Sequence, residues 1–394
     1  MHLSFLQEAA RTVALVLAAA AAAYLTLALW AVRRFGRRRR AAPEPGDALP
    51  GLTVLKPLYG EDAELEANLG TFLTQAYPGP LQIVFGVQSE DDPALAVARR
   101  LARRFAELEI AIVVDPTVHG PNRKAGNLAN MALVARHGLI AVSDSDTALA
   151  PGDLAAAVAP LGDARIGAVT CLYRSTLGAN TSWAGRLAAL YIDGWILPSA
   201  VVAAGLGPVE GCYGPLTVIR RSVLEAAGGF SRMAQLLADD HELGQITVRQ
   251  GLRVELAPCV VPTHCQEPSF GELFRHELRW ARTTLATEPV AYVFSVITWP
   301  APLIALLLFG AGELRLGILV LAWLLVLRHT LALQVARHLD ARIDDDRLAP
   351  WVLFARETLC FAIWAAAFFG GRISWRGHPL LVRAGGRLAG QGAP

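Results

Sequence analysis

The residues best suited to chemistry in this sequence are two aspartates one residue apart, Asp144 and Asp146, which follow the apolar run Leu139–Val142. A short apolar run bounded by polar residues predicts a buried strand of a parallel sheet. Ligands of open α/β sheets collect at the carboxyl ends of the strands, and two carboxylates placed there attract a cation. Their hard oxygens suit Mg²⁺ or Mn²⁺, which usually also hold substrate phosphates. The pair therefore predicts a metal-diphosphate site; a solvated turn is the alternative, because aspartate and serine are common in turns.

Two earlier patches carry side chains that would suit a nucleotide. Val87–Pro93 contains Asp91 and Asp92, either of which could accept a hydrogen bond from a nucleobase or a ribose. These residues would equally suit the start of a helix, where acidic side chains favour the helix dipole. Asn122–Asn130 places Lys124 at the expected start of another helix, where cations suit a diphosphate. An ordinary charged loop is the alternative for this second patch.

Two later patches bear on the same site. The first is the acidic run that begins with Asp239 and Asp240. The second contains His276, Arg279 and Trp280, which share one face if this stretch is helical, because they are three and four residues apart. That face would offer a hydrogen-bond donor, a fixed cation and an aromatic ring, a combination that suits a sugar diphosphate. The alternative is an amphipathic surface helix with a buried tryptophan.

Alternating strands and helices are expected around these patches. The expected strands are Leu52–Leu58, Leu81–Val87, Ile110–Val114, Leu139–Val142 and Ile166–Leu172. The expected helices lie near Ala63–Ala76, Pro93–Leu108, Lys124–Arg136 and Pro151–Ala159. Such alternation predicts an α/β fold with a mainly parallel, doubly wound sheet. No Gly-x-Gly-x-x-Gly follows the first strand, where Lys56–Asp62 stands instead, so a dinucleotide site is disfavoured.

The composition restricts the class of protein. Hydrophobic residues make up 54% of the 394 residues, which indicates membrane segments beside a folded domain. The formal net charge is +2, so no strong overall field favours nucleic acid as a partner. The five cysteines form no Cys-x-x-Cys pair, which argues against a disulfide framework or a zinc site and fits a reducing compartment.

The N-terminal part predicts a membrane anchor. Thr12–Val32 is apolar and about long enough to cross a bilayer, and six arginines follow within Arg33–Arg40. By the positive-inside rule the arginines lie in the cytoplasm and the N-terminus lies outside. Ala41–Asp47 has the composition of a linker. Arg186–Gly207 is apolar but interrupted, so we expect an interfacial segment with Tyr191 and Trp195 at headgroup level, or a buried core helix.

Three further spanning candidates lie in the C-terminal part: Val290–Phe309, Leu316–Leu333 and Val352–Phe369. The last of them carries Arg356 and Glu357, and charged residues at membrane depth are usually functional or face protein. If all three segments cross, the basic tail Gly371–Arg387 ends outside, against the charge rule. A re-entrant or interfacial last segment would keep this tail in the cytoplasm.

Taken in order along the chain, these patches resemble the inverting GT-A glycosyltransferases. More narrowly they resemble the ceramide glucosyltransferase family, membrane enzymes that glucosylate a lipid from UDP-glucose. The resemblance covers nearly the whole chain and is carried by Val54–Gly60, Val87–Pro93, Asp144–Asp146, Ala227–Phe230, Ala238–Asp240, Arg279–Trp280, Arg356–Glu357 and Ile373–Arg376. Single motifs of this kind are weak, but this many in order support one another.

The resemblance implies a fold and a domain order. The fold is a GT-A (Rossmann-like) catalytic domain with transmembrane helices at both ends of the chain. Residues 1–50 would be the anchor and a basic linker, and 51–288 the cytoplasmic catalytic domain. Residues 289–394 would be transmembrane or re-entrant helices with a basic tail. The expected location is the inner membrane of a bacterium, with the catalytic domain facing the cytoplasm.

The resemblance also implies roles for individual residues. Asp92 or Asp91 would contact the uridine and Lys124 the nucleotide, while Asp144 and Asp146 would bind the metal-diphosphate with Mg²⁺ or Mn²⁺. Asp240 would be the general base. His276, Arg279 and Trp280 would help to hold the donor, with Asp239 and Trp195 on the acceptor side. The chain departs from the family pattern at Ser89, where relatives have an aspartate, and at His276, where they have glutamine or arginine.

The implied reaction moves a hexose from a UDP-sugar to the hydroxyl of a membrane lipid. Asn122–Asn130 and Arg279–Arg282 also resemble a bacterial relative associated with hopanoids, a group whose members transfer N-acetylglucosamine to a hopanoid polyol. The donor is therefore UDP-glucose or UDP-N-acetylglucosamine, and the acceptor ceramide or bacteriohopanetetrol. Two alternatives are a processive polysaccharide synthase and a catalytically silent membrane sensor of nucleotide sugars.

Overall fold

The computed structural model describes every residue except 1, 42–47, 61–63, 179–180, 376–377 and 391–394. The chain forms two compact units. The sheet unit consists of Arg38–Thr176, Leu206–His264 and Gly386–Pro394, and the helical unit consists of Met1–Arg37, Leu177–Gly205 and Cys265–Gly385. Of the predicted linker Ala41–Asp47, all but the first residue lies outside the described residues.

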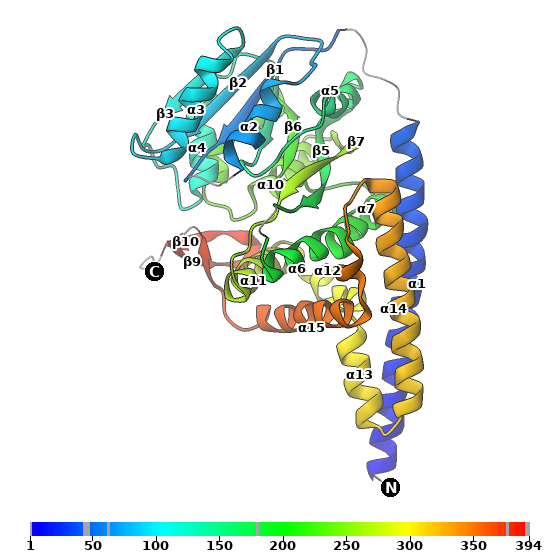
Figure 1. Cartoon of the computed structure of the whole chain (residues 1–394). Coiled ribbons are helices and arrows are strands. Elements are labelled where there is room, and N and C mark those ends of the chain that lie inside the picture. Colours follow the sequence, from blue (N-terminus) through cyan, green and yellow to red (C-terminus); the bar gives the residue numbers. More distant parts are fainter. Residues whose placement is uncertain (1, 42–47, 61–63, 179–180, 376–377, 391–394) are drawn as a thin grey trace. The chain divides into compact units, whose positions relative to one another are not determined.

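The sheet unit is built on one sheet with the strand order β3-β2-β1-β4-β6-β5-β7 (Figure 1). Its strands are β1 (Leu52–Pro57), β2 (Leu81–Val87), β3 (Glu109–Val114), β4 (Leu139–Ser143), β5 (Ile166–Thr176), β6 (Leu216–Arg220) and β7 (Arg253–His264). Neighbouring strands are parallel except that β6 is antiparallel to both β4 and β5. The five predicted strands and the mainly parallel sheet are confirmed.

Two strands of this sheet, β6 and β7, were not predicted. The strand β6 has only five residues, too few for a clear periodic pattern. The strand β7 contains Pro258 and Pro262, and proline normally argues against a strand because it lacks the N–H of the ladder. It is tolerated here because β7 is the edge strand of the sheet, next to β5 alone.

Helices cover both faces of the sheet. They are α2 (Leu65–Leu73), α3 (Pro93–Arg104), α4 (Arg123–Ala132), α5 (Asp153–Val158), the 3₁₀ turn η1 (Ala159–Gly162), α8 (Arg221–Ala226), α9 (Gly229–Met233) and α10 (Asp239–Arg249). Side chains of α2, α3 and α5 bury one core together with Val54, whereas α4, α8, α9 and α10 bury the other with Leu55. Successive strand residues point to opposite faces, so β1 contributes to both cores.

The helical unit is almost entirely helix. Its elements are α1 (His2–Arg40), α6 (Trp183–Tyr191), the π-helical turn η2 (Ile192–Ile196), α7 (Leu197–Leu206), α11 (Phe270–Thr287), α12 (Pro289–Phe294), the 3₁₀ turn η3 (Ser295–Thr298), α13 (Ala301–Gly310), α14 (Leu314–Leu339), the 3₁₀ turn η4 (Asp345–Leu348), α15 (Pro350–Ala367) and the antiparallel pair β8 (Arg372–Trp375) and β9 (His378–Val382). The tail that follows contains the 3₁₀ turn η5 (Ala384–Gly386) and the strand β10 (Leu388–Gly390).

Three helical segments of the described chain are long and apolar enough to cross a membrane: Ser4–Arg40, Trp183–Leu206 and Leu314–Leu339. The first and third agree with the predicted spans. Val290–Phe309, predicted as a single span, is instead two segments that meet at 65°. The break falls at Trp299 and Pro300, because proline lacks an N–H and its ring clashes with the preceding turn. The expected third span, now α15, is not among these three candidate segments of the described chain.

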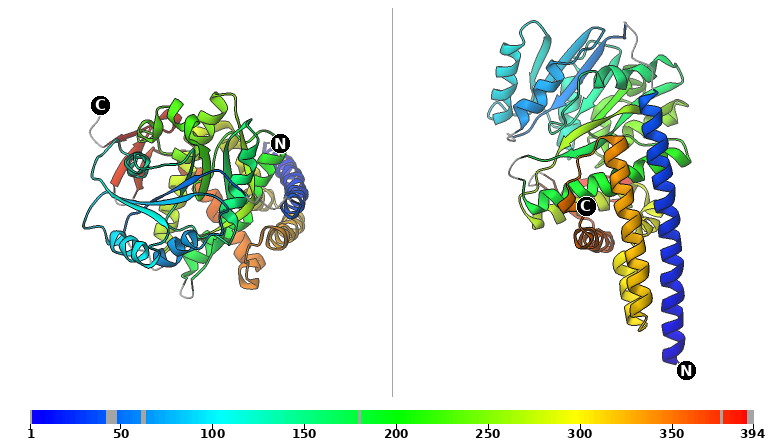
Figure 2. Two further views of the ribbon diagram at one scale, coloured as in Figure 1. Left: turned by 90° about the horizontal axis from the view of Figure 1, so that it is seen from above. Right: turned by 45° about the vertical axis from the view of Figure 1, so that its right-hand side comes forward.

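The helices α1 and α14 lie side by side and parallel (Figures 1 and 2). At one end of the pair Arg11 Nη1 lies 3.3 Å from Glu313 Oε1. Near the other end Arg33 Nε donates to Gln334 Oε1 at 3.1 Å. At that end Gly36 packs so closely on the side chain of His338 that a Cβ on the glycine would lie 2.8 Å from it.

The interior of the helical unit contains two ion pairs. Arg328 Nε of α14 donates to Glu357 Oε1 at 3.2 Å, and Arg356 of α15 pairs with Glu277 of α11. All four side chains are buried, which confirms that Arg356 and Glu357 face protein. Burial without a partner would be very costly for such charges, so the pairs fix how these helices pack.

Trp195 corrects one expectation about the membrane. Its ring is 1% exposed, its Nε1 donates to the Thr298 carbonyl at 3.0 Å, and the Arg328 guanidinium stacks over it at 4.5 Å. The prediction that Trp195 lies at headgroup level is therefore wrong, because protein encloses the ring. The burial of Trp195 agrees with the alternative, a buried core helix, at this position of the segment. The exposed tryptophans nearby are Trp183 and Trp351, whose ring centres lie 6.3 Å apart.

Candidate active site

The predicted Asp-x-Asp pair lies at the carboxyl ends of the parallel strands of the sheet unit. Asp144 directly follows β4, and Asp146 lies two residues further on. The turn that carries them is held from two sides: Thr147 N donates to the Asp144 carbonyl at 3.3 Å, and His264 N donates to the Asp146 carbonyl at 2.9 Å. Both carboxylates are partly exposed. The strand-end position that the sequence predicted is confirmed.

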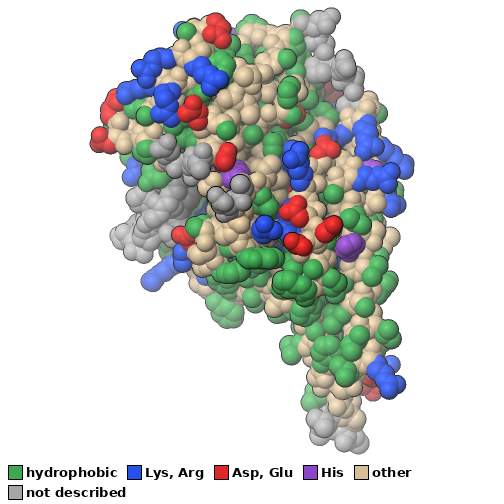
Figure 3. All heavy atoms as spheres, viewed as in Figure 1, with side chains coloured by type: hydrophobic (Ala, Val, Ile, Leu, Met, Phe, Trp, Pro, Cys, Tyr) green, Lys and Arg blue, Asp and Glu red, His purple; other side chains and the backbone are tan. Residues whose placement is uncertain are grey.

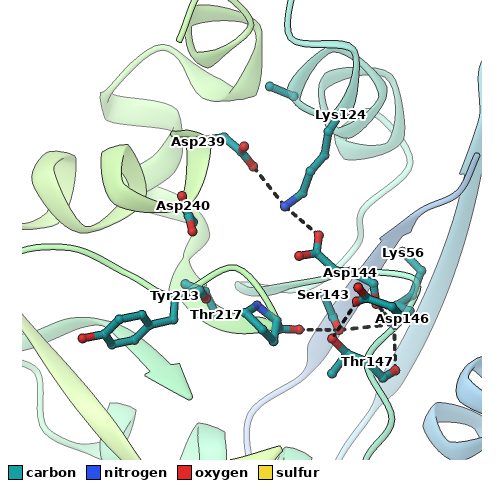
Figure 4. Close-up of polar contacts among 12 residues, drawn as sticks. Lys56, Lys124, Ser143, Asp144, Asp146, Thr147, Tyr213, Thr217, Asp239 and Asp240 are labelled. Atoms are coloured by element: carbon teal, nitrogen blue, oxygen red, sulfur yellow. Dashed lines mark hydrogen bonds and ion pairs between the residues drawn. The ribbon is translucent and has the colours of Figure 1, made fainter. Parts of the chain in front are cut away.

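Lys124 stands between two carboxylates from distant parts of the sequence (Figure 4). Its Nζ lies 2.7 Å from Asp144 Oδ1 and 3.3 Å from Asp239 Oδ2. The lysine belongs to the first turn of α4, which Asn122 caps by accepting from Ala125 N at 2.9 Å. The predicted helix start is confirmed, and it directs Lys124 towards the Asp-x-Asp turn.

The charge of Lys124 is fixed by its surroundings. Burial by itself lowers the pKa of this lysine, but the carboxylates of Asp144, Asp239 and Asp240 outweigh burial and raise the pKa above its usual value. The ammonium therefore stays protonated at any physiological pH. It neutralises part of the negative charge that three carboxylates would otherwise concentrate in one place.

Asp239, predicted on the acceptor side, is the buried partner of Lys124. Its carboxylate also accepts a hydrogen bond from Asn122 Nδ2 at 3.3 Å, and the same amide donates to the Leu236 carbonyl at 2.8 Å. Asn122 thus joins the start of α4 to the start of α10 across 117 residues of sequence. An acceptor-side role for Asp239 stays a prediction.

Asp240 faces Asp144 across Gly214. A Cβ on Gly214 would lie 3.1 Å from Asp144 Oδ2 and 3.3 Å from Asp240 Oδ2, so this glycine borders the space between the two carboxylates. Burial and the neighbouring charge of Asp239 raise the pKa of Asp240 to about 6, although Lys124 and the hydrogen bond from His241 N oppose them. A carboxylate with this pKa can accept a proton near neutral pH.

The donor set of this site fits a divalent metal ion held together with a substrate. No group of three or more His, Cys, Asp or Glu in the described chain is arranged to hold a metal by itself. Mg²⁺ commonly takes only one or two carboxylates from the protein and the rest of its ligands from water and phosphates. Asp144 Oδ2 borders the space beside Gly214, and Asp146 follows on the same turn. These two residues would hold the ion.

Lys56 is a residue of the site that the sequence did not single out (Figure 4). It lies at the end of β1, fully buried, and its Nζ donates to Ser143 Oγ at 3.2 Å and to the carbonyls of Asp144 and Thr147. The ammonium also lies 3.8 Å from the centre of the Phe72 ring. Burial lowers its pKa to about 7, against the opposing charges of Asp146 and Asp144. The available signal in the sequence was a charged residue within an otherwise uncharged strand.

Asp91 and Asp92 lie at the same edge of the sheet, after β2. Asp92 caps α3, since its Oδ1 accepts from Ala94 N at 3.0 Å and also from Gly60 N at 2.9 Å. This confirms the helix-start interpretation and ties the loops after β1 and β2 together. The side chain of Asp91 is exposed. A contact of either residue with a uridine stays a prediction.

His276, Arg279 and Trp280 belong to the helical unit, on α11, whose first turn Ser269 caps. The predicted shared face is confirmed, because the rings of His276 and Trp280 meet edge to face with their centres 4.4 Å apart. His276 Nδ1 is hydrogen-bonded to Glu267 Oε1 at 2.5 Å. All three predicted side chains are half-buried. Their role in donor binding stays a prediction.

Comparisons with known proteins agree with this arrangement. The chain matches the family described as Glycosyl transferase family 21 over residues 13–388. It is 26% identical over 254 residues to ceramide glucosyltransferase 1 of Caenorhabditis elegans, which covers 62% of this chain and 52% of that protein. It is also 26% identical over 263 residues to an N-acetylglucosaminyltransferase of Mesorhizobium japonicum, covering 64% and 59%. The chain thus spans between half and three fifths of the length of these relatives.

A solved structure with a similar fold is a mannosyltransferase of Pyrobaculum calidifontis in complex with GDP-Man and Mn²⁺. The match has a TM-score of 0.54 at 18% identity and covers 91% of this chain and 99% of the other. At this identity the likeness concerns the fold, which is of the GT-A type, as predicted. Because the family match extends over most of the 394 residues, the chain belongs to glycosyl transferase family 21.

Proposed function

We propose that this protein is an inverting glycosyltransferase that moves a hexose from a UDP-sugar to the hydroxyl of a membrane lipid. The observation that carries the proposal is the group of charges around Gly214. Lys124 bridges Asp144 and Asp239, while Asp240, with a pKa of about 6, faces the same space. A fixed cation beside a strand-end carboxylate suits a diphosphate, and a carboxylate poised near neutral pH suits a base.

The reaction would be a single displacement at the anomeric carbon. Asp240 takes the proton of the lipid hydroxyl while the hydroxyl oxygen attacks the anomeric carbon. The bond between this carbon and the UDP oxygen breaks on the opposite face. Lys124 lies beside Asp144, where its ammonium can balance the charge that grows on the departing diphosphate. A divalent ion bound by Asp144 and Asp146 would supply further charge compensation for the diphosphate. Positioning of the two substrates contributes as much as these charges do.

The proposed orientation follows from the arginine-rich end of α1. Six arginines within Arg33–Arg40 support a cytoplasmic position for this end by the positive-inside rule. The sheet unit begins at Arg38, directly after the membrane-crossing part of α1. It would therefore face the cytoplasm, where UDP-sugars are made. A lipid hydroxyl could then be glycosylated without leaving the bilayer.

The names of the two relatives refer to different sugars, glucose for the nematode protein and N-acetylglucosamine for the rhizobial protein. The deciding experiment uses the full-length protein in lipid nanodiscs with either UDP-glucose or UDP-N-acetylglucosamine. Each donor is offered with ceramide or with bacteriohopanetetrol, and the products are weighed by mass spectrometry. We expect one donor–acceptor pair to give a monoglycosylated lipid. A long polymer would support a processive synthase instead, and no UDP release with any lipid extract would support a sensor.

A further inference from the structure

The tail of the chain decides how often the C-terminal helices cross the membrane. Gly386–Pro394 belongs to the sheet unit, which the chain had left at His264. Leu388 N donates to the Gln235 carbonyl at 2.9 Å, and Leu237 N donates to the Gly386 carbonyl at 2.9 Å. Both ends of the segment 265–385 are therefore on the side of the bilayer that holds the sheet unit, here called the near side. The segment must cross the membrane an even number of times.

Two crossings are accounted for by the bent pair Pro289–Thr298 and Ala301–Gly310, taken together as one span, and by α14. The turn between α13 and α14 contains Glu313, which pairs with Arg11 near the N-terminal end of α1. The other end of α14 reaches His338, beside Gly36. Arg11 to Gly36 and Glu313 to His338 are equally long, about 38 Å of helix each at 1.5 Å per residue. The chain thus goes to the far side before α14 and is back on the near side when α15 begins.

These two crossings already make an even number, so the helix α15 should not cross the membrane. Its 18 residues would measure about 27 Å, close to the thickness of a bilayer core, so its length alone would allow one. A single crossing would strand the tail on the far side, away from Gln235 and Leu237. Two crossings would need twice the length. In Figures 1 and 2, α15 also runs across the common direction of α1 and α14.

The exposed face of α15 shows which medium it meets. The face consists of Trp351, Ala355, Thr358, Ala362 and Phe369, spaced as one side of a helix and its C-terminal turn. Trp351 is 67% exposed and Phe369 is 76% exposed, while the two charged residues of the helix, Arg356 and Glu357, point inward. Figure 3 shows hydrophobic side chains gathered in this region. A helix with charges inside and an apolar outer face is suited to lipid, and tryptophan favours the headgroup region.

We propose that α15 lies in the plane of the near leaflet, with the face from Trp351 to Phe369 resting in the headgroup region of the lipid bilayer. The membrane is then crossed by α1, by the bent pair Pro289–Thr298 and Ala301–Gly310, and by α14, and the basic tail stays with the sheet unit. The same reasoning applies to Trp183–Leu206, which begins after β5 and ends before β6 of one sheet, so it does not cross either. Through the Arg356–Glu277 pair, α15 holds α11 at the leaflet surface.

The depth of spin labels tests the proposal. Ala355→Cys and Phe369→Cys are labelled in the protein reconstituted into phosphatidylcholine–phosphatidylglycerol vesicles, and depth is measured from the relative access of oxygen and a water-soluble nickel reagent. Leu319→Cys and Leu333→Cys on α14 are the matched controls, because they are also exposed and also 14 residues apart. The native cysteines are all buried. We expect equal shallow depths on α15 and depths that differ by about 21 Å on α14.

Two outcomes overturn the proposal. A depth difference on α15 as large as that on α14 means that α15 crosses the membrane. Full access of the nickel reagent to both α15 labels means that its outer face meets water. Sidedness is an independent check, made with a membrane-impermeant maleimide on intact and inverted vesicles. Arg387→Cys in the tail should react from the same side of the membrane as Leu133→Cys in the sheet unit, and Phe5→Cys should react from the opposite side. If Arg387→Cys instead reacts from the same side as Phe5→Cys, the proposed topology is wrong.

Discussion

Replacement of the candidate base gives the sharpest test of the proposed reaction. Asp240→Asn keeps the shape of the side chain but removes its ability to take a proton. General base catalysis usually contributes about 10²–10⁴-fold, or about 3–5 kcal/mol at about 1.4 kcal/mol per tenfold. The substitution also removes one of the three carboxylates that crowd Lys124, so binding of the negatively charged donor should not weaken. We expect kcat to fall at least a hundredfold while the Kd for the UDP-sugar stays within about threefold.

The assay combines turnover with binding and with pH. Product formation is followed in nanodiscs, and donor binding is measured by calorimetry on the same preparation. Since the pKa of Asp240 is raised to about 6, the ionised base is complete above this pH and is lost below it. The acid limb of kcat/KM should therefore fall about tenfold per pH unit below about pH 6 in the unsubstituted protein. This limb should be absent from the residual activity of Asp240→Asn.

A matched control is Glu225→Gln, an exposed carboxylate of the sheet unit that pairs with Arg221. It should leave turnover, binding and the pH profile unchanged. Retention of more than a tenth of the turnover in Asp240→Asn would remove this residue from the role of base. An unchanged acid limb in that variant would refute the reasoning about its pKa, even if turnover fell.

The remaining predictions concern the neighbours of Asp240. Lys124→Met removes a charge that lowers the pKa of Asp240, so the acid limb of kcat/KM should move to higher pH and donor binding should weaken in calorimetry; an unmoved limb would contradict the electrostatic coupling. Gly214→Ala should place a methyl group between Asp144 and Asp240 and abolish donor binding in calorimetry without unfolding the protein. The matched control is Gly138→Ala, where a Cβ meets no atom within 4 Å; it should change neither donor binding nor the free energy of unfolding. Lys56→Met leaves the carbonyls of Asp144 and Thr147 without the donor Lys56 Nζ, so the free energy of unfolding should fall by about 1–3 kcal/mol. In the same variant kcat should fall by a larger factor than KM rises. Full activity together with lower stability would mean that Lys56 stabilises the fold and has no role in the reaction.

The sequence by itself determined those features that depend on neighbouring residues. The strand before Asp144 and the span of α1 are continuous apolar runs, and the length of each run predicts a strand in one case and a spanning helix in the other. The position of Lys124 follows similarly, since Asn122 is a good helix cap three residues before Ala125. The shared face of His276 and Trp280 needs only the helical repeat. Each of these predictions uses forces that act within one element.

The tertiary structure decided everything that depends on contacts between distant segments. Lys56 meets the Asp144 carbonyl across 88 residues, and Asn122 meets Asp239 across 117, so no local pattern reports either contact. The burial of Trp195 and the outward face of α15 are equally non-local, because an apolar helix has the same sequence whether protein or lipid covers it. Our proposal that α15 does not cross the membrane rests on two backbone hydrogen bonds of the tail near Gln235 and Leu237. The composition of a segment determines its affinity for the membrane. The packing of the rest of the chain determines whether that segment crosses the membrane.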